Sequence, residues 1–275
     1  MDAAETAEST AVLDRALASL VSGIPQTLAG PDTVAFSERC VEVPWVAAHL
    51  QAPGRLLDVG WTMSPPEWLG VLLAVQDRGA ELTGIDIIDP LRVQSRFPSQ
   101  WLDRVLAVPV RVENILKSNP TSGVYDTVTC VSTLEHIGFD IATPPENMAT
   151  AFVRASNPSE APDYRDPNTD LEFLNAAHRL LRPGGSLLIT VPAGFGSAIL
   201  HQDSLGLFTH QFEYDESSWN AIISDERFQA IDEAYFRHED EAGWFAVSRF
   251  DQLTDQTSAL RPFATGCAMV HLIRK

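Results

Sequence analysis

Two acidic residues, each at the end of a short apolar run, have the type and spacing that binding chemistry needs. Asp58 lies in the run 55–59, which Gly60 follows directly. Asp86 ends a second run at 82–86. In nucleotide-binding α/β units, a glycine after the first strand lets the backbone approach the ligand, and an acid after the second strand holds the ribose hydroxyls. The three residues therefore predict a site for a nucleoside.

The loop after the first of these runs does not suit a pyrophosphate. Residues 58–63 contain only one glycine, Gly60, whereas a dinucleotide needs three glycines at fixed spacing. A ligand with a nucleoside but no phosphates tolerates a single glycine, because that residue alone allows close backbone approach.

Apolar periodicity predicts the elements that position these residues. Strand and helix patterns alternate along most of the chain, which indicates a parallel, doubly wound α/β sheet. Thr169 or Asp170 is expected to cap the fourth helix, and residues 183–185 (Pro-Gly-Gly) to end it. The predicted helices cover 11–21, 37–50, 67–77, 171–181 and 214–224, and the predicted strands 55–59, 82–87, 108–112, 127–131, 186–191 and an antiparallel pair at 228–236 and 265–273.

Five short motifs follow one another in an order typical of one enzyme family. They are residues 57–60 (Leu-Asp-Val-Gly), 84–86 (Gly-Ile-Asp), 125–128 (Tyr-Asp-Thr-Val), 134–138 (Leu-Glu-His-Ile-Gly) and 179–185 (Arg-Leu-Leu-Arg-Pro-Gly-Gly). In these motifs the chain resembles class I S-adenosylmethionine-dependent methyltransferases from about residue 38 onward. The resemblance implies a Rossmann-like, doubly wound, seven-stranded and mostly parallel sheet with an antiparallel last strand. We expect an N-terminal helical cap at 1–50 and a methyltransferase domain at 51–275.

The resemblance also implies a set of residues for the cofactor, S-adenosylmethionine. Asp58 and Gly60 would lie near its methionine part, and Asp86 would accept hydrogen bonds from both ribose hydroxyls. Backbone carbonyls after the fourth strand, at Ser132 and Thr133, would hold its amino group.

Three further residues are candidates for the adenine end. Asn114 could pair with the adenine edge through its amide, although an Asn in a loop also commonly caps a turn. Ile87 and Ile115 could enclose the ring, but apolar residues at strand ends are equally ordinary core residues.

Two other strings resemble segments of a methyltransferase subgroup associated with carbohydrate and polysaccharide loci. They are residues 38–45 and 164–170, and by this likeness Arg39 and Glu42 would bind the carboxylate and amino ends of the cofactor. A surface salt bridge on one helix is the alternative for that pair. About 25 extra residues precede the second string, within a proline-rich segment at 137–169 that is either a lid over the site or a simple insertion.

Three histidines are the candidates for a catalytic base. His136 follows the fourth strand, and His201 and His210 lie in residues 192–214, which we predict to be a loop of the substrate pocket. A sugar hydroxyl or an ammonium group must lose a proton during methyl transfer, which suits histidine. Each of the three could instead be a structural or surface residue.

The composition excludes several kinds of partner. A formal charge of −18 argues against nucleic acid and anionic membranes and favours cationic small molecules, unless it only reflects a charged surface. Three widely spaced cysteines offer no zinc site, and we expect no metal. With no signal peptide pattern and no apolar run of about 20 residues, we expect a cytoplasmic protein.

We therefore predict an S-adenosylmethionine-dependent methyltransferase of small-molecule biosynthesis. Its acceptor would be an oxygen or nitrogen nucleophile on a small polar molecule that is sugar-like or aminoglycoside-like. The alternatives are a nicotinamide-dependent oxidoreductase and a non-catalytic protein that keeps the fold and the cofactor site. The sequence does not specify the oligomeric state.

Overall fold

The computed structural model describes residues 3–118, 123–139, 165–202, 208–253 and 264–275. Its main sheet has eight strands in the order β3-β2-β1-β4-β5-β10-β8-β9. The pairs among β3, β2, β1, β4 and β5 are parallel, whereas β10 runs antiparallel to both β5 and β8. The strands are β1 (Gly54–Val59), β2 (Ala80–Asp86), β3 (Val110–Val112), β4 (Tyr125–Val131), β5 (Leu181–Pro192), β8 (Phe228–Glu239), β9 (Gly243–Val247) and β10 (Gly266–Arg274).

The mostly parallel sheet with an antiparallel strand near its end is confirmed, but the expected number of seven strands is too low. The additional strand is β9, which turns back from β8 and pairs with it from Glu239↔Gly243 to Tyr235↔Val247. The five residues of β9, one of them glycine, are too few for their pattern to indicate a strand. They become a strand because they pair with the edge of β8.

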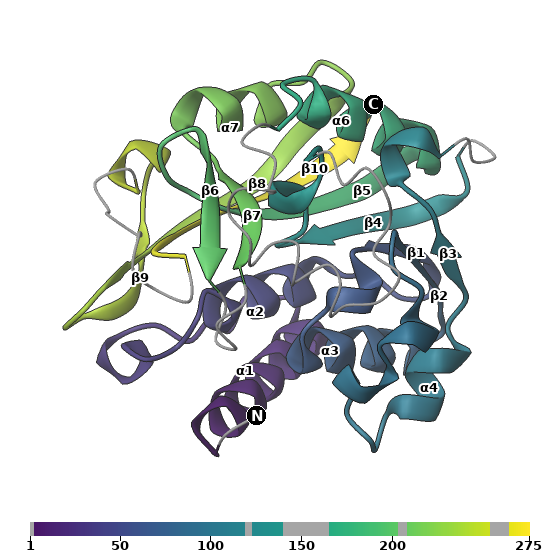
Figure 1. Ribbon diagram of the computed structural model, residues 1–275, viewed down its shortest axis with the longest axis horizontal. Coiled ribbons are helices and arrows are strands. Elements are labelled where there is room, and N and C mark those ends of the chain that lie inside the picture. Colours follow the sequence, from purple (N-terminus) through teal and green to yellow (C-terminus); the bar gives the residue numbers. More distant parts are fainter. Residues whose placement is uncertain (1–2, 119–122, 140–164, 203–207, 254–263) are drawn as a thin grey trace.

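Helices cover both faces of this sheet (Figure 1). In that view α1, α2, α3 and α4 lie below it, and α6 and α7 lie above it. The helices are α1 (Ala3–Ser22), α2 (Arg39–His49), α3 (Pro66–Asp77), α4 (Leu102–Ala107), α6 (Thr169–Leu180) and α7 (Glu216–Ile223).

Two hydrophobic clusters fill the space between the helices and the sheet. One contains Val12 of α1, Trp45 of α2 and Trp68 of α3, so the N-terminal helices share a single core with the sheet. The other contains Phe173 of α6 and Trp219 of α7. The three cysteines are buried in these two clusters as free thiols.

Helix α2 contains Pro44, which has no N–H to donate to the carbonyl of Cys40. The N–H of Leu28 donates to that carbonyl instead, over 2.9 Å. The segment before α2 therefore satisfies the group that the proline leaves unpaired, and it is held against the helix.

The start of α6 differs from the prediction. Thr169 is its first residue and Asn168 precedes it, but neither Thr169 nor Asp170 caps the helix. The carboxylate of Asp170 accepts hydrogen bonds from Arg165 and Tyr214 instead, so a tertiary contact competes successfully with local capping.

The segment 192–214, predicted to be a loop, contains a β-hairpin. Its strands β6 (Ser197–Gln202) and β7 (Phe208–Glu213) form a separate two-stranded antiparallel sheet. The helix predicted at 214–224 begins at Glu216, because Asp215 and Ser218 form a reciprocal capping box.

Of the segment 137–169, residues 140–164 lie outside the described part, and so does the lid expected there. The ends of this segment lie together, since Phe139 and Arg165 form an antiparallel bridge and Asp166 N donates to Gly138 O over 3.0 Å. In the described part of the chain, no helix combines the length and apolar character that crossing a membrane requires.

Candidate functional site

Asp86 stands at the carboxyl end of β2, where the sequence placed the ribose. Its side chain is 9 % exposed and accepts hydrogen bonds from the backbone N–H groups of Thr62 and Ile88, each over 2.9 Å. Burial raises its pKa above the usual value. A carboxylate has about four acceptor sites, so Asp86 can accept hydrogen bonds from a diol while these backbone contacts persist.

Asp58, in contrast, points into the core. Its carboxylate accepts hydrogen bonds from Trp68 Nε1 at 3.0 Å, Thr129 Oγ1 at 2.7 Å and Ser64 Oγ at 3.4 Å. Burial raises the pKa of Asp58 to about 7 in spite of these donors. Asp58 therefore ties β1 to β4 and α3 and shapes the loop above it.

That loop packs tightly against the end of β4. Gly60 has a φ of +89°, and a Cβ built on it would lie 2.3 Å from Thr133 Oγ1. Trp61 is fully buried beside Gly84, where a Cβ would lie 2.6 Å from the indole ring. The Trp61 side chain thus fills the core beneath the loop, and only the backbone of residue 61 lies at the edge of the sheet.

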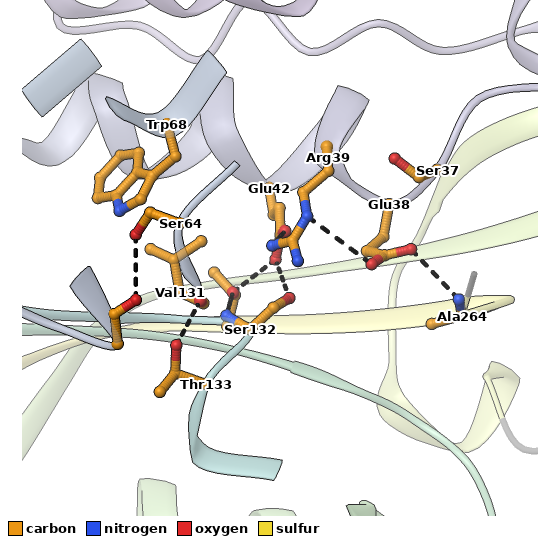
Figure 2. A network of polar contacts seen from close by, with 12 residues as sticks. Ser37, Glu38, Arg39, Glu42, Ser64, Trp68, Val131, Ser132, Thr133 and Ala264 are labelled. Carbon is orange, nitrogen blue, oxygen red and sulfur yellow. Dashed lines mark hydrogen bonds and ion pairs between the residues drawn. The ribbon is translucent and has the colours of Figure 1, made fainter. Parts of the chain in front are cut away.

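Arg39 lies between two carboxylates at the start of α2 (Figure 2). Its guanidinium donates to Glu42, and its Nε is 4.0 Å from Glu38 Oε1. Glu38 also accepts a hydrogen bond from Ala264 N, and burial raises its pKa to about 7.

Glu42 connects this group to the sheet. Its Oε2 accepts hydrogen bonds from Ser132 Oγ at 2.8 Å and Thr190 Oγ1 at 2.6 Å. Arg39 and Glu42 do form the salt bridge on one helix that was the alternative, but Glu42 is fully buried, so the pair does not lie on the surface. We call Glu38, Arg39, Glu42, Ser132 and Thr190 the Arg39 cluster.

The backbone at the end of β4 is strained where it meets this cluster. Ser132 has a φ of 38°, and in the described ranges it is the only non-glycine residue with a positive φ. Its N–H donates to Thr190 Oγ1 over 2.9 Å. Strain of this kind persists only where the surroundings fix it, and it concentrates at functional sites.

Glu135 and His136 follow directly and differ in exposure. The Glu135 side chain is 3 % exposed, and its Oε2 is buried with no hydrogen-bond partner among the described residues. Burial raises the pKa of Glu135 to about 8, with Glu42 and Arg39 among its charged neighbours. The His136 ring is 40 % exposed, and its Nε2 lies 3.8 Å from Glu135 Oε1.

The residues predicted for the adenine end have local structural roles. Asn114 Oδ1 accepts a hydrogen bond from Leu116 N over 2.9 Å, which is the capping alternative. Ile115 is buried in the cluster that contains Phe173, and Ile87 is half-buried against the other cluster, which contains Trp68. Their placement around an adenine ring stays a prediction.

The other two histidines lie in the hairpin, His201 in β6 and His210 in β7, and β7 packs against the turn 134–136 that follows β4. His201 pairs with Thr209 and His210 with Leu200 in the β6–β7 register, although their side chains are outside the described part. Below the hairpin, the Arg165 guanidinium lies 4.8 Å from the Phe212 ring and donates to the carbonyls of Leu134 and Ile137.

Sequence reasoning did not select four residues that the structure brings to this edge. Thr190 lies inside an apolar strand, and Glu38 and Glu135 each stand next to a residue that was chosen. The fourth, Arg165, was noticed only as part of a motif. For Glu38 and Glu135 the sequence offered one signal, a charged residue beside an apolar run. This signal predicts that the side chain is buried, but not which residues it contacts.

The site fits the nucleoside cofactor that the family resemblance implies. Asp86 offers acceptors for a ribose, Arg39 offers donors for a carboxylate, and Glu42 offers acceptors for an ammonium group. Among the described residues, no group of three His, Cys, Asp or Glu side chains could hold a metal ion.

Comparison with solved structures shows what this architecture is similar to. An S-adenosylmethionine-dependent methyltransferase from Methanosarcina mazei has 14% identity and a TM-score of 0.52, with 84% of this chain and 97% of that chain covered. The 1,6-didemethyltoxoflavin-N1-methyltransferase of Burkholderia thailandensis has 14% identity and a TM-score of 0.46, over 89% of this chain and 77% of that one.

Neither a protein-family model nor a curated protein sequence matches the chain. At 14% identity, the Methanosarcina structure is evidence of a shared fold. With the strand order and the antiparallel β10, it shows that this chain has the α/β fold of class I S-adenosylmethionine-dependent methyltransferases.

Proposed function

We propose that this protein binds S-adenosylmethionine and transfers its methyl group to an oxygen or nitrogen atom of a small polar molecule. The single observation that carries the proposal is the pairing of two kinds of group at one sheet edge. Asp86 ends β2 with acceptors for a diol, and the Arg39 cluster lies at the end of β4 with a cation for a carboxylate.

The chain's own residues would bind and orient the two reactants. Asp86 would hold the ribose, and Arg39 and Glu42 would hold the carboxylate and the ammonium of the methionine end. When bound, the cofactor supplies an activated methyl group on a sulfonium. Because Glu42, Glu135 and Asp86 are all buried, their contacts with the ligand would act away from bulk water, where charges interact more strongly.

The acceptor is proposed to be sugar-like or aminoglycoside-like. The net charge of −18 favours a neutral or cationic molecule over an anionic one. The likeness of residues 38–45 and 164–170 to methyltransferases of carbohydrate loci also supports this class.

Isothermal titration with S-adenosylhomocysteine tests the cofactor site. The wild-type protein should bind it, and Asp86→Ala should weaken binding by about 10- to 100-fold, the loss expected for hydrogen bonds to a charged group. Asp77→Ala is the matched control, since Asp77 ends α3 in a surface ion pair with Arg104 and should leave the affinity unchanged. Tight binding of NAD without binding of S-adenosylhomocysteine would instead support an oxidoreductase.

A further inference from the structure

The carboxylates around Arg39 differ in whether their oxygens have hydrogen-bond partners. Glu8 accepts hydrogen bonds from Ser37 N at 2.7 Å and Ser37 Oγ at 2.8 Å. Glu67 accepts one from Ser9 Oγ at 2.8 Å. These two carboxylates, from α1 and α3, therefore have partners within the protein.

The carboxylates of α2 have partners as well. Glu42 is bound by Arg39, Ser132 and Thr190, and Glu38 by Ala264 N, with the Arg39 guanidinium alongside. Glu135 Oε2 is different, because it is buried and has no partner in the described structure. An unpaired buried carboxylate oxygen is costly, so a donor that reaches Glu135 would gain the full strength of a charge-assisted hydrogen bond.

Charge balance indicates which kind of donor fits. Arg39 provides one positive charge against the carboxylates of Glu38, Glu42 and Glu135. The methionine end of the proposed cofactor adds an ammonium and a carboxylate, and its sulfonium adds one further positive charge. Burial raises the pKa values of Glu38 and Glu135 to about 7 and 8, and a bound cation would stabilise the ionised form of both carboxyl groups.

We propose that the acceptor substrate is an amine that arrives as an ammonium ion, and that Glu135 binds this ammonium and takes its proton. The inference rests on the proposed function and deepens it. An ammonium proton passes to the Glu135 carboxylate, and the freed nitrogen lone pair forms the bond to the methyl carbon. The carbon–sulfur bond breaks, and its electron pair stays on sulfur.

The surroundings of Glu135 suit this role. Its electrostatic neighbours are Arg39, Glu38 and Glu42 of α2, Cys130 of β4, Tyr214 after β7 and Cys267 of β10, with His136 next to it in sequence. The exposed ring of His136 shows that this part of the edge reaches solvent. Burial raises the pKa of Glu135 to about 8, so at pH 7 most of the ligand-free protein carries a proton there, which a bound cation would displace.

The experiment titrates methylammonium chloride into protein loaded with S-adenosylhomocysteine. Binding is followed by saturation-transfer NMR, and proton release is followed with an indicator dye at pH 7. The wild-type protein should bind methylammonium but not methanol, and on binding methylammonium it should release up to one proton per site. Glu135→Gln should weaken binding by about tenfold or more and abolish the proton release.

Glu67→Gln is the matched control, because Glu67 is a second buried carboxylate near Arg39 whose partner is Ser9. It should keep both signals. Should Glu135→Gln not fold, Glu135→Asp must keep the proton release with weaker binding. Equal binding by Glu135→Gln, equal binding of methanol, or no binding of methylammonium to the loaded wild type overturns the inference. Failure to bind S-adenosylhomocysteine at all instead overturns the proposed function.

Discussion

The Arg165 guanidinium donates a hydrogen bond to the carbonyl of Leu134 over 3.0 Å, and Arg165 also forms an antiparallel bridge with Phe139. The same group binds Ile137 O, Asp170 and the Tyr214 hydroxyl. One buried cation thereby joins the turn that carries Glu135 and His136 to α6 and to the hairpin.

Removing this cation should destabilise the protein strongly. Arg165→Ala leaves Asp170 without its ion-pair partner and two carbonyls without a donor, for which we expect a loss of about 3 to 5 kcal/mol. Arg182→Ala removes an exposed pair with Asp126 and should cost about 1 kcal/mol or less. Urea unfolding of both variants measures the difference, and equal losses would show that Arg165 is no anchor.

The close packing of Gly60 against Thr133 predicts a second pair of variants. Gly60→Ala combines backbone strain at a φ of +89° with a steric clash, for an expected cost of about 2 to 4 kcal/mol. Gly79→Ala has a similar φ of +95°, but its nearest atom is 3.7 Å away, so only the strain of about 1 kcal/mol should appear. Thermal unfolding compares them, and a Gly60→Ala protein as stable as Gly79→Ala would contradict the clash.

The segment before α2 covers the β9 edge through buried hydrogen bonds. Trp244 N donates to Thr33 Oγ1 over 2.9 Å, so Thr33→Val leaves a buried N–H unpaired and should cost about 1 to 3 kcal/mol. The Thr265 hydroxyl is buried without a partner in the part of the chain that the structure describes, and the same isosteric change there should be neutral or stabilising. Urea midpoints in the reverse order would disprove this assignment.

Stability should fall as the pH rises from about 6.5 to 8. Burial raises the pKa of Asp58 and Glu38 to about 7 and that of Glu135 to about 8, so in this range the folded protein binds more protons than the unfolded chain. The free energy of unfolding then decreases with pH, by at most about 1.4 kcal/mol per unit for each group. His271, whose pKa is lowered to about 4, acts in the opposite direction only below about pH 6.5.

Urea unfolding at pH 6.5, 7.25 and 8 measures this slope. Glu135→Gln should flatten it, because one of the three titrating carboxyls is gone. A free energy of unfolding that stays constant or increases over the range contradicts the assigned burial effects.

How far the candidate site could be predicted depends on how local its causes are. The positions of Asp86 and Gly60 at strand ends could be predicted, because strand ends and positive-φ turns leave a signal in a few adjacent residues. Glu42 was ambiguous, because its partners Ser132 and Thr190 are 90 and 148 residues away in the chain. The hairpin of β6 and β7 was not predicted. Each strand is stabilised by its pairing with the other, and this pairing leaves no clear pattern within either strand alone.

The sequence by itself determined the alternation of strands and helices, the positions of Asp58 and Asp86 at strand ends, and the acidic charge. Each of these follows from residue type and short-range periodicity. Only the tertiary structure decided that Asp58 turns into the core, that β9 extends the sheet, and that Glu135 is buried near Arg39 with no hydrogen bond to its Oε2 from the described residues. Burial and pairing depend on residues far apart in the chain, and folding alone brings those together.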